Sequence, residues 1–170
     1  YLDLFIGSDG RNLNSLYVNL RNGKFQADKS NEKLFAYPNG TTINDATFLD
    51  FNNDGYLDLL IAGEPSEKDG QGMFLYYNDG HGIFQNVSSL LPLELKTGRQ
   101  IALFDYNDDG DTDAIIAGIN GGISLLRNDG GNNNHFISMK LVGLKAGSAK
   151  NNHFGIGAKI EVRAGDLYQT

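Results

Sequence analysis

The sequence has 170 residues and a formal net charge of -7, with 16 Asp and 5 Glu against 14 Lys and Arg together. An acidic chain without a cluster of basic residues excludes nucleic acid as a partner, because contacts to phosphates need a basic surface. The absence of Cys excludes disulfides, thiolate metal sites and cysteine nucleophiles, and no apolar run approaches the ~20 residues needed to insert a helix into a membrane.

Three similar segments follow one another along the chain. Each is a short apolar run with Asp as its second residue, and the runs occupy residues 2–7, 57–63 and 112–118. The aspartates are Asp3, Asp58 and Asp113, and successive ones are 55 residues apart. So regular a spacing indicates a repeat protein.

A second element follows each of these runs, at residues 16–19, 75–78 and 125–128. In the later two copies it leads into Asn-Asp-Gly, at residues 78–80 and 128–130. Because Asn-Gly and Asp-Gly favour tight turns, we expect a strand followed by a hairpin turn in both copies.

The repeats have the pattern of β-strands. Their apolar runs are short, rich in Ile, Leu, Phe and Tyr, and bounded by Gly, Asn and Asp. Continuous runs such as 59–62 and 114–117 favour strands that are covered on both faces, as when sheets stack against one another. The sequence therefore predicts an all-β fold of β-propeller blades, each a four-stranded antiparallel sheet, with a 55-residue repeat.

A propeller needs at least ~4 blades to close, whereas residues 1–133 supply only about two and a half repeats. The first copy also begins in the middle of its motif, so we expect the chain to be a fragment that carries a partial propeller. If the chain is complete, its open sheet edges need a partner chain, which predicts a homo-oligomer joined through those edges.

The pattern changes after residue 133. Residues 135–142 and 157–163 predict two strands, separated by a loop rich in Gly, Ser, Lys and Asn. We therefore divide the chain into the repeats, residues 1–133, and a short C-terminal β unit, residues 134–170.

The strongest chemical signal is a nine-residue loop that overlaps the start of the second and of the third apolar run. Both loops have Asp or Asn at positions one, three, five and nine, and Gly at position six. Oxygen side chains at alternate positions of a tight turn point toward one centre, and with the carbonyl of position seven and water they supply the ligands that Ca²⁺ takes. The candidate ligands are Asp50, Asn52, Asp54, Tyr56 and Asp58 in the first loop and Asp105, Asn107, Asp109, Asp111 and Asp113 in the second.

Ordinary turns also use Asn, Asp and Gly, but two loops with the same oxygen positions favour a cation site. An EF-hand needs flanking helices and a Glu at position twelve, where this chain has Ile61 and Ile116. Position nine, between strands, instead resembles the calcium loops of FG-GAP and VCBS-type repeats, the blades of integrin α-subunit-like β-propellers. The resemblance covers residues 1–133 and implies Ca²⁺ as the cofactor. Of the first copy of the loop, the sequence contains only Asp3.

Residues 151–162 contain an Asn shortly before Gly-Ile-Gly-Ala and resemble the start of an ASPIC/UnbV module. Such a module follows propeller repeats in cartilage acidic protein-like proteins. The resemblance is partial, because about 37 residues are present and His153 stands where the family more often has Arg.

Catalysis finds little support, because His81, His135 and His153 lack the spacing of a metalloprotease motif and no nucleophile elbow occurs. We expect a non-catalytic calcium-binding repeat protein, secreted or on the cell surface, with structural Ca²⁺ in its loops. Its expected role is adhesion or recognition of a protein or carbohydrate ligand. The alternatives are the self-assembling subunit and an enzyme on a propeller scaffold, for which His135 with His153 is the only candidate centre.

Overall fold

The computed structural model describes residues 3–9, 14–36, 40–130, 134–143, 152–165 and 167–169. The chain divides into two compact units, residues 1–134 and residues 135–170. It is nearly all β, which confirms the predicted fold class. Within the described ranges, no helix is long and apolar enough to cross a membrane.

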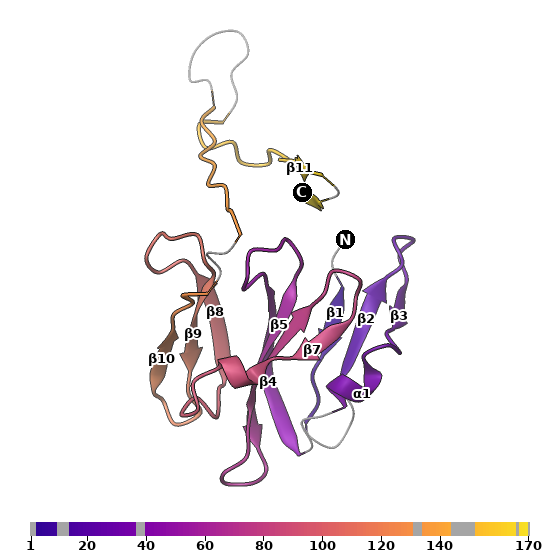
Figure 1. Cartoon of the computed structure of the whole chain (residues 1–170), viewed down its shortest axis with the longest axis vertical. Coiled ribbons are helices and arrows are strands. Elements are labelled where there is room, and N and C mark those ends of the chain that lie inside the picture. Colours follow the sequence, from indigo (N-terminus) through magenta and orange to yellow (C-terminus); the bar gives the residue numbers. More distant parts are fainter. Residues whose placement is uncertain are drawn as a thin grey trace. The chain divides into compact units, whose positions relative to one another are not determined.

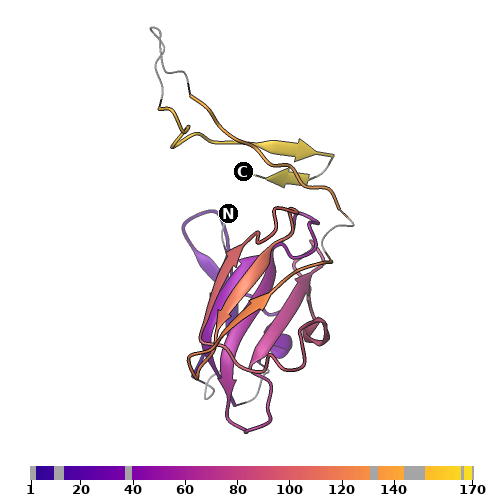
Figure 2. The same ribbon diagram turned by 90° about the vertical axis from the view of Figure 1, so that its left-hand side faces the viewer.

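Three antiparallel sheets lie side by side in the first unit (Figure 1). The first sheet contains β1 (Leu4–Ile6), β2 (Ser15–Asn19) and β3 (Phe25–Ala27). The second contains β4 (Thr41–Leu49), β5 (Asp58–Pro65), β6 (Met73–Asn78) and β7 (Phe84–Asn86), and the third contains β8 (Gln100–Phe104), β9 (Asp113–Ala117) and β10 (Ile123–Leu126). One short helix, α1 (Glu32–Phe35), follows β3, and a 3₁₀ turn, η1 (Ser88–Leu90), follows β7. In the turned view of Figure 2, the β8–β10 sheet lies in front of the other two.

The middle sheet has four strands in the order β4-β5-β6-β7, as predicted for a whole repeat. The two flanking sheets each have three strands among the described residues. The hairpin turn predicted at residues 78–80 is confirmed, because β6 pairs with β7 across it. The one predicted at residues 128–130 would continue into residues 131–133, which lie outside the described residues.

Strand β5 is buried on both faces, as its continuous apolar run predicts. Leu59 belongs to a cluster with Leu16 and Phe35, which we call the Leu59 core. Leu60, the next residue, faces the other way and belongs to a cluster with Ile116 of β9, which we call the Leu60 core. The Leu59 core also contains Ile61, Phe74, Tyr76 and Phe84, and the Leu60 core also contains Leu49, Ala62, Met73, Leu75, Leu91, Leu95 and Ala114. The middle sheet is therefore packed against both neighbours.

A β-bulge in β4 adds polar contacts between the second and the third sheet. The register of β4 against β5 shifts between Ile43 and Asp45. At this point the Asn44 side chain donates a hydrogen bond of 2.9 Å to the Gly98 carbonyl, and the Asp45 carboxylate accepts one of 2.8 Å from the Ile101 amide. These bonds fix the position of β8 next to β4.

The second unit contains one described hairpin, in which β11 (Val162–Ala164) pairs with β12 (Leu167–Gln169). Residues 135–143 form no strand, so the strand predicted at residues 135–142 is wrong. The strand predicted at residues 157–163 begins only at Val162. An alternating sequence forms a strand only where a neighbouring strand pairs with it, and the described residues provide none before Val162.

We predict that Leu59→Ala and Leu60→Ala each lower the free energy of unfolding by about 2–5 kcal/mol, because each leaves a cavity in a different core. The measurement is urea unfolding of the whole chain. Leu93→Ala is the matched control, since that side chain is 85% exposed. A sheet covered on one face only would tolerate one of the two core substitutions, and that result would contradict the structure.

Candidate functional site

The two predicted loops occupy equivalent places in neighbouring sheets. The first loop, residues 50–58, connects β4 to β5, and the second loop, residues 105–113, connects β8 to β9. Position nine of each loop is the first residue of the strand that follows, Asp58 in β5 and Asp113 in β9. Asp3 has the same place directly before β1. The structure thus places the predicted ligands on two equivalent loops, one in each of two neighbouring sheets.

In the first loop, side-chain oxygens accept hydrogen bonds from the loop's own amides. The Asp50 carboxylate accepts from the Asp54 and Gly55 amides at 3.1 and 2.8 Å. The Asn52 side-chain oxygen accepts from the same Asp54 amide at 3.2 Å, and the Asp54 carboxylate accepts from the Tyr56 amide at 2.9 Å. Positions one, three and five are therefore folded around one turn.

The second loop repeats this set of bonds. The Asp105 carboxylate accepts from the Asp109 and Gly110 amides at 3.2 and 2.9 Å. The Asn107 oxygen accepts from the Asp109 amide at 3.4 Å, and the Asp109 carboxylate accepts from the Asp111 amide at 2.9 Å. Two sequences that differ at positions two, four, seven and eight thus form one local structure.

The backbone of both loops passes through the left-handed region at positions four and six. At position four, φ is 55° for Asn53 and 59° for Asp108, and at position six it is 87° for Gly55 and 86° for Gly110. Asn and Asp tolerate this region better than other side chains, and Gly adopts it without strain. The Asn/Asp and Gly pattern of the sequence is therefore a requirement of the turn.

The aspartate at position nine is buried in both loops, with exposed fractions of 0% for Asp58 and 1% for Asp113. One oxygen of Asp58 accepts the Phe51 amide at 3.1 Å, and one oxygen of Asp113 accepts the Tyr106 amide at 2.7 Å. Each buried carboxylate thereby holds the beginning of its own loop against the end.

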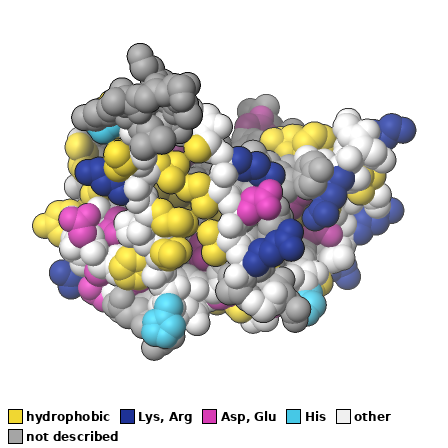
Figure 3. All heavy atoms as spheres, turned by 90° about the horizontal axis from the view of Figure 1, so that it is seen from above, with side chains coloured by type: hydrophobic (Ala, Val, Ile, Leu, Met, Phe, Trp, Pro, Cys, Tyr) yellow, Lys and Arg dark blue, Asp and Glu magenta, His cyan; other side chains and the backbone are white. Residues whose placement is uncertain are grey.

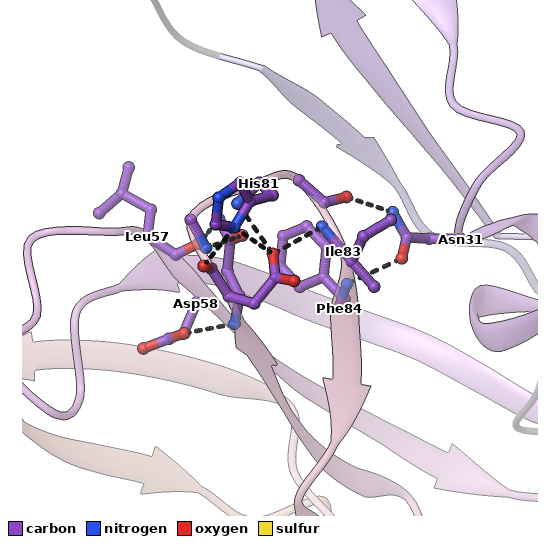
Figure 4. Close-up of polar contacts among 10 residues, drawn as sticks. Asn31, Leu57, Asp58, His81, Ile83 and Phe84 are labelled. Atoms are coloured by element: carbon purple, nitrogen blue, oxygen red, sulfur yellow. Dashed lines mark hydrogen bonds and ion pairs between the residues drawn. The ribbon is translucent and has the colours of Figure 1, made fainter.

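The other oxygen of this aspartate is bound by an asparagine that sequence reasoning treated as a turn residue. The Asn78 amide donates to Asp58 at 2.7 Å (Figure 4), and the Asn128 amide donates to Asp113 at the same distance. In the first repeat, the Asn19 amide donates to Asp3 at 2.8 Å. The sequence signal for this contact was the Asn at the end of the second element of each repeat. Turn propensity alone also explains Asn at that position.

Burial raises the pKa of Asp58 to about 7, and the negative charges of Asp54 and Asp50 add to this rise. The hydrogen bonds from the amides of Asn78 and Phe51 lower the same pKa and offset part of the rise. Burial also raises the pKa of Asp50 above its ordinary value. The first loop therefore concentrates carboxylates whose ionised forms repel one another, which is the electrostatic condition that a bound cation relieves.

The donor set of both loops fits Ca²⁺. Within the described ranges, no group of three or more His, Cys, Asp or Glu side chains already stands where it could hold a metal ion. The side-chain oxygens of the candidate ligands accept hydrogen bonds from loop amides instead. An ionised carboxylate has about four lone-pair sites, so each of these carboxylates can still bind a cation. Hard oxygen donors from Asp and Asn are the ligands that Ca²⁺ prefers.

Position seven, whose carbonyl was the expected ligand, differs between the loops. Tyr56 is 42% exposed, and its ring covers Gly80, where an added Cβ would meet it. Asp111 is only 1% exposed, and its carboxylate accepts a hydrogen bond of 2.8 Å from the Asn53 side chain of the first loop. The two loops are therefore in direct contact.

The three histidines are divided between the two units of the chain. His81 is exposed and its Nδ1 lies 3.9 Å from the Asp79 carboxylate, on the turn between β6 and β7 (Figure 4). His135 is exposed and His153 is half-buried, both in the second unit.

A comparison with protein families matches the FG-GAP-like repeat twice, at residues 1–61 and 50–116. The chain belongs to the FG-GAP-like repeat family. Both matches include the first loop, and the antiparallel sheets of the first unit are blades of the propeller type that these repeats form. No curated protein and no solved structure matches the chain. The family matches end before residue 117, so the ASPIC/UnbV resemblance stays a prediction.

We predict that, with divalent cations removed by a chelator, the free energy of unfolding falls as the pH rises from about 4 to about 7. The folded-state pKa of Asp58 is about 7 and its ordinary value is 3.8, so folded molecules bind more protons between these values and lose stability as the proton leaves. This one group contributes a slope of up to about 1.4 kcal/mol per pH unit.

The test compares urea unfolding of the unmodified chain and of Asp58→Asn at several pH values. The Asp58→Asn slope should be shallower, whereas Asp69→Asn, which changes an exposed carboxylate, should leave the slope unchanged. Equal slopes for the unmodified chain and Asp58→Asn would mean that Asp58 does not titrate in this range.

Proposed function

We propose that this chain is a non-catalytic, calcium-binding part of an extracellular protein, and that Ca²⁺ is a structural element of its blades. The observation that supports the proposal is the same set of hydrogen bonds in two loops whose residues differ at four of nine positions. Membership of the FG-GAP-like family supports the location, because such repeats are typical of extracellular proteins.

In this proposal, Asp50, Asn52, Asp54 and Asp58 hold one cation with their side chains, and the matching residues of the second loop hold another. The bound charge offsets the repulsion among the carboxylates and so favours the folded loop. Extracellular sites of this kind bind Ca²⁺ at about 10⁻⁴–10⁻³ M, which suits the medium outside a cell.

The proposed role in adhesion or recognition is supported by exposed aromatic rings at both loops. Tyr56 is 42% exposed and Tyr106 is 56% exposed. Next to Tyr56, a hollow of about 450 Å³ between the first two sheets also includes Asn78 and His81. Aromatic faces beside polar groups suit protein or carbohydrate ligands. Figure 3 shows described side chains of both charge signs, Lys and Arg in dark blue and Asp and Glu in magenta.

For residues 134–170, we propose the beginning of an ASPIC/UnbV-like unit, as in cartilage acidic protein-like proteins. The support is local and lies in Asn152, whose side chain donates to the Ile156 carbonyl at 2.7 Å and accepts from the Ile156 amide at 2.5 Å. These two hydrogen bonds to one residue position the Gly-Ile-Gly-Ala segment, in which φ is 64° at Gly155 and 84° at Gly157.

The experiment is thermal unfolding with Ca²⁺, with chelator and with Mg²⁺. At about 10 mM Ca²⁺, two such sites should raise the melting temperature by on the order of 5–15 °C. Asp54→Ala and Asp109→Ala should each lose part of this rise, and the double variant should lose all of it. Mg²⁺ should have a smaller effect, because it tolerates fewer ligands and a stricter geometry.

Asp69→Ala is the matched control, since it removes an exposed carboxylate outside both loops and should retain the whole effect. An unchanged melting temperature in millimolar Ca²⁺, or the same rise in the double variant, would refute the proposal.

A further inference from the structure

The two loops are joined by side-chain hydrogen bonds that cross from one blade to the next. The Asn53 side chain, at position four of the first loop, donates to the Asp111 carboxylate at 2.8 Å and to the Gly110 carbonyl at 3.4 Å. Gly110 and Asp111 are positions six and seven of the second loop, where the chain turns and where the proposed carbonyl ligand lies. One residue of the first loop therefore holds the turn of the second.

A second connection passes through Asn128. Its side chain donates to the Phe51 carbonyl of the first loop at 2.6 Å, while its amide donates to Asp113 of the second loop at 2.7 Å. Phe51 in turn donates its amide to Asp58. A continuous series of hydrogen bonds thus links the two buried carboxylates. The Asn134 side chain adds a bond of 2.9 Å to the carbonyl of Asn52.

The residue equivalent to Asn53 in the second loop is Asp108, and its surroundings differ. Both have the same left-handed backbone, but Asn53 is half-buried whereas Asp108 is exposed and has no hydrogen-bond partner for its side chain within the described residues. The loop with Asn at position four is therefore the one that makes the contact between blades. Of the two residue types, only Asn can donate a hydrogen bond to the acceptors at Gly110 and Asp111.

We propose that Asn53 is a positioning residue for the cation of the other blade. This inference rests on the proposed function. Asn53 fixes the turn that presents the Asp111 carbonyl, and the entropy of ordering that turn is then already lost before the cation arrives.

The test separates the two loops by disabling one at a time. In Asp54→Ala, only the second loop retains all its ligands, and in Asp109→Ala only the first does. Calorimetric titration with Ca²⁺ measures the dissociation constant in each background, with and without Asn53→Gly. Gly accepts the left-handed backbone, so the substitution removes the side chain without straining the loop.

Asn53→Gly should weaken Ca²⁺ binding by the second loop about three- to tenfold, the range expected for the loss of one ordinary hydrogen bond. It should change binding by the first loop, which contains it, by less than about twofold, since the side chain is not among the proposed ligands. Asp108→Gly is the matched control at the same position of the second loop, and its effect on that loop should be the smaller.

Asn53→Asp is a second variant that keeps a side chain already accepted at this position in the second loop. It replaces the donor by a carboxylate opposite the Asp111 carboxylate, so it should weaken the second loop at least as much as Asn53→Gly. Thermal unfolding in chelator shows whether each variant is folded.

Each remaining outcome is decisive. If the unmodified chain binds Ca²⁺ but Asn53→Gly and Asp108→Gly affect the second loop equally, this inference alone is wrong. A fall in melting temperature in chelator with unchanged affinity would make Asn53 a purely structural contact between blades. If the unmodified chain binds no Ca²⁺, the proposed function and this inference fail together.

Discussion

The arrangement of the candidate site depends on one buried carboxylate in each of the two complete loops. Asp58 and Asp113 are excluded from water, and a buried carboxylate is tolerated only where donors satisfy it. The donors come from the start of the loop and from an asparagine at or just beyond the end of the third strand, Asn78 or Asn128. The loop, the strand and the asparagine therefore have to be in place together for the buried carboxylate to be satisfied. A repeat that forms this contact holds both ends of the loop whose oxygens are proposed to bind a cation.

Packing between blades determines which loops meet. The middle sheet is covered on both faces, so the Leu60 core sets the second blade against the third and places their loops side by side. The contacts from Asn53 and Asn128 then connect two sites that are far apart in the sequence. Each repeat thus forms its own loop, packing in the hydrophobic cores brings two loops together, and asparagine side chains connect these loops by hydrogen bonds.

Sequence reasoning reached the features that depend on local pattern. The 55-residue spacing, the all-β fold and the burial of β5 on both faces follow from periodicity, since the apolar run of residues 59–62 serves two cores. The roles of Asn53 and Asn128 could not be predicted, because their partners belong to another blade and depend on how sheets pack. The strand expected at residues 135–142 failed for a related reason, as alternation describes one strand and says nothing about a partner.

The most direct test of the central claim is a crystal structure of the chain grown with millimolar Ca²⁺, with anomalous difference density to locate the ions. The account predicts one peak in each loop, with oxygens of Asp50, Asn52, Asp54 and Asp58 about 2.3–2.6 Å from the ion in the first loop. The second loop should show the equivalent set. Well-ordered loops that hold only water under these conditions would contradict the account and leave the Asp, Asn and Gly residues as turn formers.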